Sequence, residues 1–538
     1  MRLEKLSYLF PMLTMLCACS TPAISSSIAE SSSFSSESSL VESSSSIEET
    51  TSTWEKSALD NPALRDLYHA DKRDTVISSG NQKILVLPIE FKGFLYNDEV
   101  LDQLNRCLSG DGRDDTEYWE SLSSFYKKSS YGKLNLSFEI ASPYLAQDEQ
   151  GNALTPKEVY EMNGPTATSM GDHGLKLIQS AYYSYLDSHG EQALQDLDQD
   201  KNGLVDGVIA VYACPDAGTG KYTFDQTGYY WAFTSWAGSI ASMVDGLDFV
   251  TPSLECPGVD VFMWASIDFI YDSSYVLRHP GAVDPHTFIH EFGHMLGLDD
   301  YYPNGTTFSP LGGLDMMDLN IQDHNCFSKS LLGWCDPYVF DAEEEDVITL
   351  RPFESSGDCI LIPSSSWNGT SYDEYLMIDF YTPTGLNQLD AEYALNWQRP
   401  KGYQNPGVRI FHVDARVMKY KYTQLGIESE YVSSFEDLGD PNYGYRFGAS
   451  NCVKGQGLGD DAFSLVHMME SSGKNTFISG KTATDESLFH EGDHFMIYSY
   501  QSFFPNKKLL NNGDTFLYSI FVEKINEEGA RIAIEKIG

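Results

Sequence analysis

The chain has 538 residues, which is long enough for several domains and more than one buried core. Its formal net charge of −43 argues against nucleic acid and anionic lipid as partners of the folded body, because both would be repelled. The same surplus of carboxylates suits solubility outside the cell and leaves ligands for calcium.

The N-terminus has the pattern of a signal peptide over residues 1–19, with basic residues before an apolar run at residues 6–16. Residues 16–19, Leu-Cys-Ala-Cys, resemble a bacterial lipobox, in which Cys19 would carry the lipid. An ordinary cleaved signal, or Cys17 as the modified residue, is the alternative. No later segment is apolar for long enough to cross a bilayer. We therefore expect an extracellular protein, lipid-anchored to the bacterial membrane, that meets the membrane only through this anchor.

Residues 20–54 form a Ser/Glu/Thr-rich tract that cannot bury apolar area, so we expect a disordered tether. Residues 55–80 are polar and weakly patterned. They fit either a short pro-segment or a linker.

The folded body opens with a nearly continuous apolar run at residues 83–91, which predicts a buried strand. A helix over residues 118–131, a strand over 132–140 and a second helix over 175–186 follow. Residues 220–283, rich in aromatic and small residues, fit both a strand that lines a substrate groove and an ordinary sheet.

An acidic loop lies between the second helix and an apolar strand at residues 207–213. Its candidate calcium ligands are the side chains of Asp198, Asp200, Asn202 and Asp206 and the backbone carbonyl of Leu204. Carboxylates this close repel one another unless a cation lies between them. The twelfth position is Ile209 and not Glu, so the loop is not an EF-hand. We predict structural calcium; an acidic turn without an ion is the alternative.

A zinc-binding pattern occupies residues 290–294, His-Glu-Phe-Gly-His. Asp284 can cap a helix here, Pro285 suits its first turn, and Gly297 is a natural stop. His290 and His294 then lie one turn apart on the same face, where two imidazoles form half of a tetrahedral zinc site.

Two acidic residues complete this pattern. Glu291 points to the side, where it can act as general base on a water at the metal. Asp300 stands at the last position of HExxHxxGxxD, where metzincins have a third histidine, and a carboxylate is an acceptable zinc ligand. Asp299 and a more distant acid are competing third ligands. A chance match is the remaining alternative, and the helix start, the helix stop and the further ligand argue against it.

Residues 311–318 contain a Gly-Gly turn followed by Met316 and Met317. Metzincins place a methionine from such a turn beneath the metal, and we choose Met317 for this role. Core packing is the alternative. A helix over residues 324–334 is expected next, with Gly333 as its stop.

From residue 341 onward the pattern is typical of β structure. Strands are expected over residues 374–381 and 407–414, and residues 515–522 with 530–536 suggest a hairpin. His412 and Asp414 share one face of their strand, where a packed structural histidine is favoured over a role near the metal. The sparse cysteines are expected to be buried thiols, with a Cys326–Cys335 bridge as the alternative.

Several of these segments together resemble the immune inhibitor A family of secreted bacterial zinc metallopeptidases. The main carriers are residues 290–301, 312–317 and 328–334, with weaker similarity at residues 129–134, 198–206, 374–375 and 407–414. The resemblance implies an α+β fold with a metzincin-like catalytic domain, which we place at residues 81–340, followed by a β-rich region at 341–538. It also implies endopeptidase activity, catalytic zinc on His290, His294 and Asp300, Glu291 as general base, and stabilising calcium. The lipobox and the lack of a long pro-domain set this chain apart from the secreted relatives.

The expected function is that of a zinc-dependent endopeptidase at the cell surface, which hydrolyses extracellular proteins or peptides. The oxyanion needs a further donor, for which a tyrosine or His412 could serve. The first alternative is a non-catalytic surface adhesin on a metalloprotease fold, which would have no need of Glu291. The second is a solute-binding lipoprotein, which would have no need of the zinc helix.

Overall fold

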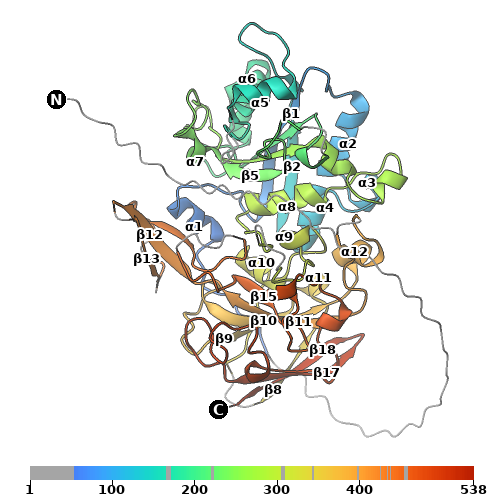
Figure 1. Ribbon diagram of the computed structural model, residues 1–538, viewed down its shortest axis with the longest axis vertical. Coiled ribbons are helices and arrows are strands. Elements are labelled where there is room, and N and C mark those ends of the chain that lie inside the picture. Colours follow the sequence, from blue (N-terminus) through green and yellow to red (C-terminus); the bar gives the residue numbers. More distant parts are fainter. Residues whose placement is uncertain are drawn as a thin grey trace.

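The computed structural model describes residues 54–537 except 165–170, 220–222, 304–308, 342–344, 397–398, 425, 433, 437 and 453–457. The predicted signal peptide with Cys19, and the tether up to residue 53, lie outside the described residues. Among the residues described, no helix is both long and apolar enough to span a bilayer. The fold is mixed α/β, with two halves stacked along the long axis (Figure 1).

The upper half is built on a twisted sheet with strand order β2-β1-β4-β6-β5, and β3 pairs with β1. The strands are β1 Gly80–Glu90, β2 Leu134–Ile140, β3 Tyr144–Leu145, β4 Val208–Tyr212, β5 Phe233–Trp236 and β6 Val261–Ser266. All neighbours are parallel except β5, which runs antiparallel to β6 at the edge. The inner strands β4 and β6 are buried along their whole length, which explains the unbroken apolar runs in the sequence.

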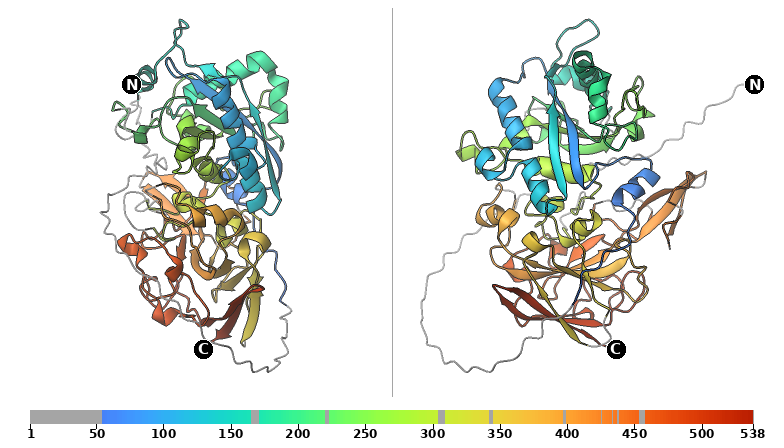
Figure 2. Two further views of the ribbon diagram at one scale, coloured as in Figure 1. Left: turned by 90° about the vertical axis from the view of Figure 1, so that its right-hand side faces the viewer. Right: turned by 180° about the vertical axis from the view of Figure 1, so that it is seen from behind.

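Helices cover both faces of this sheet (Figures 1 and 2). The longer ones are α2 Asp98–Ser109, α4 Leu122–Ser129, α5 Pro156–Met162, α6 Leu175–His189 and α8 His286–Met295. Alternate residues of β1 belong to two different cores, one on each face of the sheet. Ile84 and Val86 pack in the core with α2, α4 and α8. Leu85 and Leu87 pack in a second core with α5 and α6. Short helices complete this half: α3 Arg113–Thr116, α7 Ala237–Ala241, η1 Glu191–Asp196, η2 Ala217–Thr219, η3 Ile267–Tyr271 and η4 Val276–Arg278.

The lower half is mainly β structure and begins after α9 Met316–Leu319 and α10 Cys326–Leu331. One sheet has the order β15-β11-β10-β9-β7 and another β16-β17-β18-β8, and a third core fills the space between them. A smaller sheet, β13-β12-β14, projects beside α1 (Figure 1).

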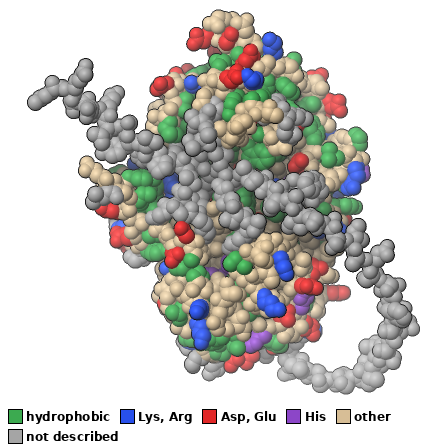
Figure 3. Space-filling view, viewed as in Figure 1, with side chains coloured by type: hydrophobic (Ala, Val, Ile, Leu, Met, Phe, Trp, Pro, Cys, Tyr) green, Lys and Arg blue, Asp and Glu red, His purple; other side chains and the backbone are tan. Residues whose placement is uncertain are grey.

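The strands of this half are β7 Tyr338–Val339, β8 Asp346–Leu350, β9 Cys359–Pro363, β10 Glu374–Tyr381, β11 Gly407–Asp414, β12 Val417–Thr423, β13 Gly426–Tyr431, β14 Gly444–Phe447, β15 Val466–Met468, β16 His494–Met496, β17 Tyr518–Asn526 and β18 Gly529–Lys536. Its short helices are α11 Phe353–Ser356, α12 Gln388–Glu392, η5 Gly385–Asn387, η6 Phe477–Ser479, η7 Asp485–Ser487 and η8 Ile497–Ser499. Among the described side chains on the face in Figure 3, acidic and basic groups are interspersed.

The structure confirms the predicted strands β10 and β11 and the antiparallel hairpin of β17 and β18. The helix expected over residues 118–131 is shorter, because Ser121 caps α4 by accepting the amide hydrogen of Ser124. The helix expected over residues 324–334 is also shorter, because Asn325 caps α10 in the same way. Gly333 follows it with φ of 71°.

The segment before the sheet is packed into the body. It forms α1 Leu64–Ala70, and Leu64, Leu67 and Val76 are buried. Each such side chain contributes about 1.5–3 kcal/mol when buried. Together they are a large fraction of the roughly 5–15 kcal/mol by which a folded domain is stable. Residues 64–76 are therefore part of the core.

Candidate metal centre

The centre is organised by α8, which is buried along almost its whole length. Asp284 was expected at the helix cap; Pro285 occupies that position instead. The Asp284 carboxylate still accepts the amide hydrogen of His286 at 3.0 Å, so the first turn keeps an acidic partner. The helix ends at Met295, and Gly297 has φ of 99°, which lets the chain turn back toward the helix.

Two histidines of α8 and one aspartate after the turn converge. The Nε2 atoms of His290 and His294 each lie 3.1 Å from Oδ1 of Asp300. His290 donates from Nδ1 to the Met316 carbonyl, and His294 donates from Nδ1 to the Leu298 carbonyl, both at 2.7 Å. Because Nδ1 carries the proton, each neutral ring presents the lone pair of Nε2 to the carboxylate.

These three groups fit zinc. Two lone pairs and a carboxylate repel one another unless a positive charge lies between them. Imidazole nitrogen and carboxylate oxygen are zinc ligands, and a second hydrogen bond from the far ring nitrogen is typical of metal-binding histidines. All three side chains are buried and can exclude competing water.

The charges of this cluster also shift the pKa values of His294 and Asp300. Burial alone would lower the pKa of His294, but Asp300 outweighs it and raises this pKa to about 10. Burial alone would raise the pKa of Asp300, whereas the two histidines hold it well below its usual range. A proton can supply the charge that the cluster needs, so protons compete with a metal for this site.

Glu291 lies beside the cluster and lines a pocket. Among the described residues, its buried Oε2 atom has no hydrogen-bond partner. Burial raises the pKa of this carboxyl group. A carboxylate that is exposed only to a pocket and has a raised pKa is suited to take up a proton and return it.

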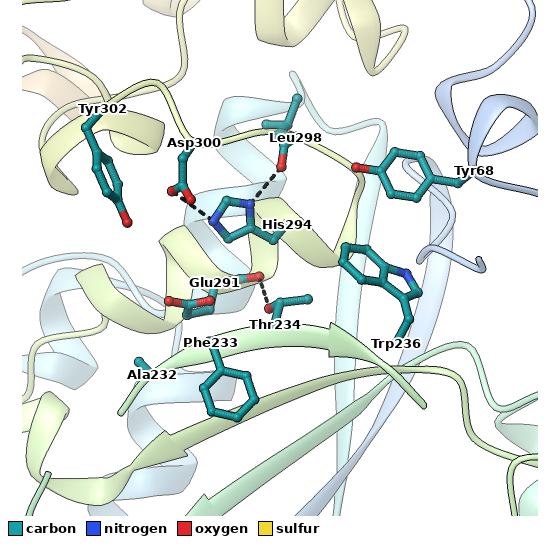
Figure 4. Close-up of a pocket in the computed structure, with 10 residues that line it drawn as sticks. All are labelled: Tyr68, Ala232, Phe233, Thr234, Trp236, Glu291, His294, Leu298, Asp300 and Tyr302. Atoms are coloured by element: carbon teal, nitrogen blue, oxygen red, sulfur yellow. Dashed lines mark hydrogen bonds and ion pairs between the residues drawn. The ribbon is translucent and has the colours of Figure 1, made fainter. Parts of the chain in front are cut away.

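The pocket lies between α8 and the edge strand β5 (Figure 4). Its lining consists of Tyr68, Ala232, Phe233, Thr234, Trp236, Glu291, His294, Leu298, Asp300 and Tyr302. The Thr234 hydroxyl donates to the Glu291 backbone carbonyl at 2.7 Å, which fixes β5 against the helix. In the described part of the chain β5 pairs with β6 alone, so its other edge faces the pocket.

Two tyrosines of the lining carried no assignment from the sequence. Tyr302 follows the third ligand candidate closely, and its ring centroid lies 6.1 Å from that of His290. Figure 4 shows its hydroxyl directed toward the Glu291 side of the pocket. Its place two residues after Asp300 could have identified it. Tyr68 comes from α1, and only the tertiary structure brings it here.

His412, the other candidate donor, lies outside the pocket lining. Its Nε2 atom is 2.7 Å from the carboxylate of Glu374 on the neighbouring strand, and its ring packs on Phe504. This arrangement agrees with a packed structural histidine. Asp414 binds Arg416 through two hydrogen bonds.

Met317 packs directly against α8. A Cβ added to Gly293 would lie only 2.5 Å from the Met317 sulfur, so this close approach requires glycine. Met316 contributes its backbone carbonyl to His290 instead. Asp299, the competing third ligand, is not in the converging cluster. Cys326 and Cys335 are free thiols, so the alternative bridge between them is not formed.

The acidic loop brings three of its five candidate ligands together. One carboxylate oxygen from each of Asp198, Asp200 and Asp206 lies within 4.8 Å of the others. Burial raises the pKa of Asp206 to about 7, and the charge of Asp200 adds to this effect. The Asn202 side chain donates to Asp74 at 2.7 Å and accepts the amide hydrogen of Leu204 at 2.8 Å. Leu204 also pairs with Gly258 in an isolated bridge.

No protein-family model matches this chain, and comparison with curated proteins finds no match. The site offers a buried His-His-Asp cluster, an adjacent Glu291 whose Oε2 atom has no hydrogen-bond partner among the described residues, and a pocket along a strand edge.

Proposed function

We propose that this protein is a zinc-dependent endopeptidase that hydrolyses extracellular proteins. One observation carries the proposal: the Nε2 atoms of His290 and His294 meet Oδ1 of Asp300 at 3.1 Å beside the carboxylate of Glu291. His290, His294 and Asp300 would hold the metal. The pocket along β5 suits an extended peptide, because a strand edge offers backbone hydrogen bonds that do not depend on sequence.

When bound, zinc would polarise the scissile carbonyl and lower the pKa of a water to near 7. Glu291 removes a proton from the attacking water and later delivers it to the leaving amine. Tyr302 donates its hydroxyl hydrogen to the carbonyl oxygen as that oxygen becomes negative.

The order of features supports membership of the immune inhibitor A family with a metzincin-like domain. A zinc helix is followed by a glycine turn, a third ligand and a methionine that packs under the helix. We further propose structural calcium at Asp198, Asp200 and Asp206, because one carboxylate oxygen from each lies within 4.8 Å of the others. The Arg65 guanidinium also pairs with Asp200 and supplies part of the positive charge. Attachment to the cell membrane through lipidated Cys19 completes the proposal.

The test compares Glu291→Ala with His294→Ala, using zinc content and casein cleavage as separate readouts. Glu291→Ala should keep zinc and lose about 10²–10⁴-fold in rate, because it removes only the general base. His294→Ala should lose both zinc and activity, because it removes a ligand. Full activity in the Glu291→Ala protein would reject the assignment.

A further inference from the structure

Residues 54–76 are tied to the upper half around the metal centre. The Tyr68 hydroxyl donates to the Gly297 carbonyl at 3.0 Å, at the turn that follows α8. The Asp74 amide donates to the Asp260 carboxylate at 2.7 Å. Trp236 of the edge strand donates from Nε1 to the Asp74 carbonyl at 2.6 Å. The segment therefore touches both walls of the pocket, the helix side and the β5 side.

The same segment is tied to the lower half. Lys56 forms an ion pair with buried Asp358 at 2.7 Å, and Trp54 stacks on Phe340 with ring centroids 5.3 Å apart. Asn61 exchanges hydrogen bonds with Ser371 at 2.9 and 2.7 Å. These contacts join the two halves of the molecule.

A third set of contacts reaches the small sheet of β12, β13 and β14. Asp71 accepts the hydroxyl hydrogen of Tyr420 at 2.5 Å and binds Arg446 at 3.0 Å. The Asp71 carboxylate is 3% exposed, so these hydrogen bonds are shielded from solvent. A single segment of chain thus holds three parts of the fold together.

Tyr68 and Trp236 also form one end of the pocket, opposite Tyr302 across His294 (Figure 4). Their ring centroids lie 5.6 Å apart. The Arg73 guanidinium lies 4.3 Å from the Tyr68 ring and 4.8 Å from the Trp236 ring, which fixes both rings. Leu298 lies beside these two rings, so this end of the pocket offers apolar side-chain surface to a ligand.

We infer that residues 54–76 stay with the mature protein and that Tyr68 selects substrates that place an apolar side chain at this end of the pocket. A removable pro-segment would cover a finished cleft. Removal of this segment would instead delete one wall of the cleft and uncover Leu64, Leu67 and Val76. The choice of substrate rests on the proposed peptidase function, whereas retention of the segment does not.

Retention is tested by cutting the chain in place. A recognition site for an exogenous protease is inserted between exposed residues Ser79 and Gly80, with the same insertion between Glu527 and Glu528 in the β17–β18 turn as control. After cutting, both pieces should co-elute in gel filtration, and the casein rate should stay within about two-fold of the control. Release of the N-terminal piece with a rise in activity would overturn the inference.

Selection is tested with peptide pairs that differ by one apolar or polar residue. Tyr68→Ala should reduce the ratio of kcat/KM for apolar over polar peptides about ten-fold, while Tyr68→Phe keeps the ring and the ratio. Tyr422→Ala is the control, because Tyr422 on β12 is 54% exposed. If the Tyr68→Ala protein does not fold, Tyr68→Leu takes its place. An unchanged ratio overturns the role of Tyr68. A wild-type chain that cleaves no peptide rejects the peptidase proposal, and co-elution of the cut pieces still decides retention.

Discussion

Asp300 lies 3.1 Å from His294 through Oδ1 and Nε2, while the other nitrogen of that ring is held by the Leu298 carbonyl. Although burial alone would lower the pKa of His294, the negative charge of Asp300 raises this pKa to about 10, and the same charge would attract a metal ion. Asp300→Asn keeps the shape and removes the charge, so zinc affinity should fall at least about 100-fold. Asp299→Asn is the matched control and should bind zinc normally. Equal loss in both proteins, measured by competition with a zinc chelator, would contradict the ligand assignment.

Tyr302 supplies the donor for the oxyanion in the proposed chemistry. Tyr302→Phe removes only the hydroxyl group, so kcat should fall roughly 10²-fold with little change in KM. Tyr68→Phe is the control in the same pocket, because the Tyr68 hydroxyl is committed to the Gly297 carbonyl. Steady-state kinetics on one peptide measures both. A Tyr302→Phe protein with wild-type kcat would show that the donor lies elsewhere.

His286 holds the start of α8 and lies flat on Trp119, with ring centroids 3.6 Å apart. Burial would lower the pKa of His286, but Asp284 and Asp390 outweigh it and raise this pKa to about 9. Its contribution to stability is therefore complete below about pH 6.5 and is lost as the pH rises through about 9, a change of about 3 kcal/mol. Urea unfolding at pH 7 and pH 10 measures it.

The variant His286→Gln should be about 3–5 kcal/mol less stable at pH 7, because it leaves two buried carboxylates without their cation. It should also lose less stability than the wild type between pH 7 and pH 10. His189→Gln, at an exposed position in α6, is the control. Parallel loss in His286→Gln and wild type would mean that another group titrates.

His324 has the opposite pH dependence. Among the described residues neither ring nitrogen has a hydrogen-bond partner, and burial lowers the pKa of this histidine to about 3. Its favourable contribution is present above about pH 6.5 and is lost as the pH falls toward 3, by roughly 4–5 kcal/mol. His324→Leu should therefore be at least as stable as the wild type at pH 7 and more stable at pH 4. A destabilised variant at pH 7 would show that the ring nitrogens are hydrogen-bonded.

The acidic loop should couple calcium to stability. Calcium at about 100 times its Kd should add roughly 2.7 kcal/mol to the free energy of unfolding, and Asp206→Ala should abolish this gain. Asp187→Ala, exposed on α6, is the control for loss of one negative charge. Thermal unfolding with and without calcium gives the result. An equal calcium effect in Asp206→Ala would place the ion elsewhere.

Local patterns predicted the elements that carry the centre. The spacing of His290 and His294 fixes their shared helical face, and Gly297 returns the chain to Asp300. Strands β10 and β11 were predicted with their bounds because both are rich in β-branched and aromatic residues.

The features of the site that the sequence did not predict depend on long-range contacts. Residues 55–80 have a weak pattern, yet Tyr68 of this segment lines the pocket through a hydrogen bond to Gly297, which no local pattern encodes. The edge strand β5 is too short for its sequence to distinguish it from an ordinary sheet strand. The Asn202 amide nitrogen donates to Asp74, a partner far away in the chain that no local pattern indicates.

Cleavage of casein by one purified sample tests the central claim most directly. It is measured before treatment, after removal of metal by a chelator, and after addition of one equivalent of zinc. We predict activity, loss of activity and recovery with zinc. Cleavage that survives complete removal of zinc would contradict the claim that His290, His294 and Asp300 hold a catalytic metal.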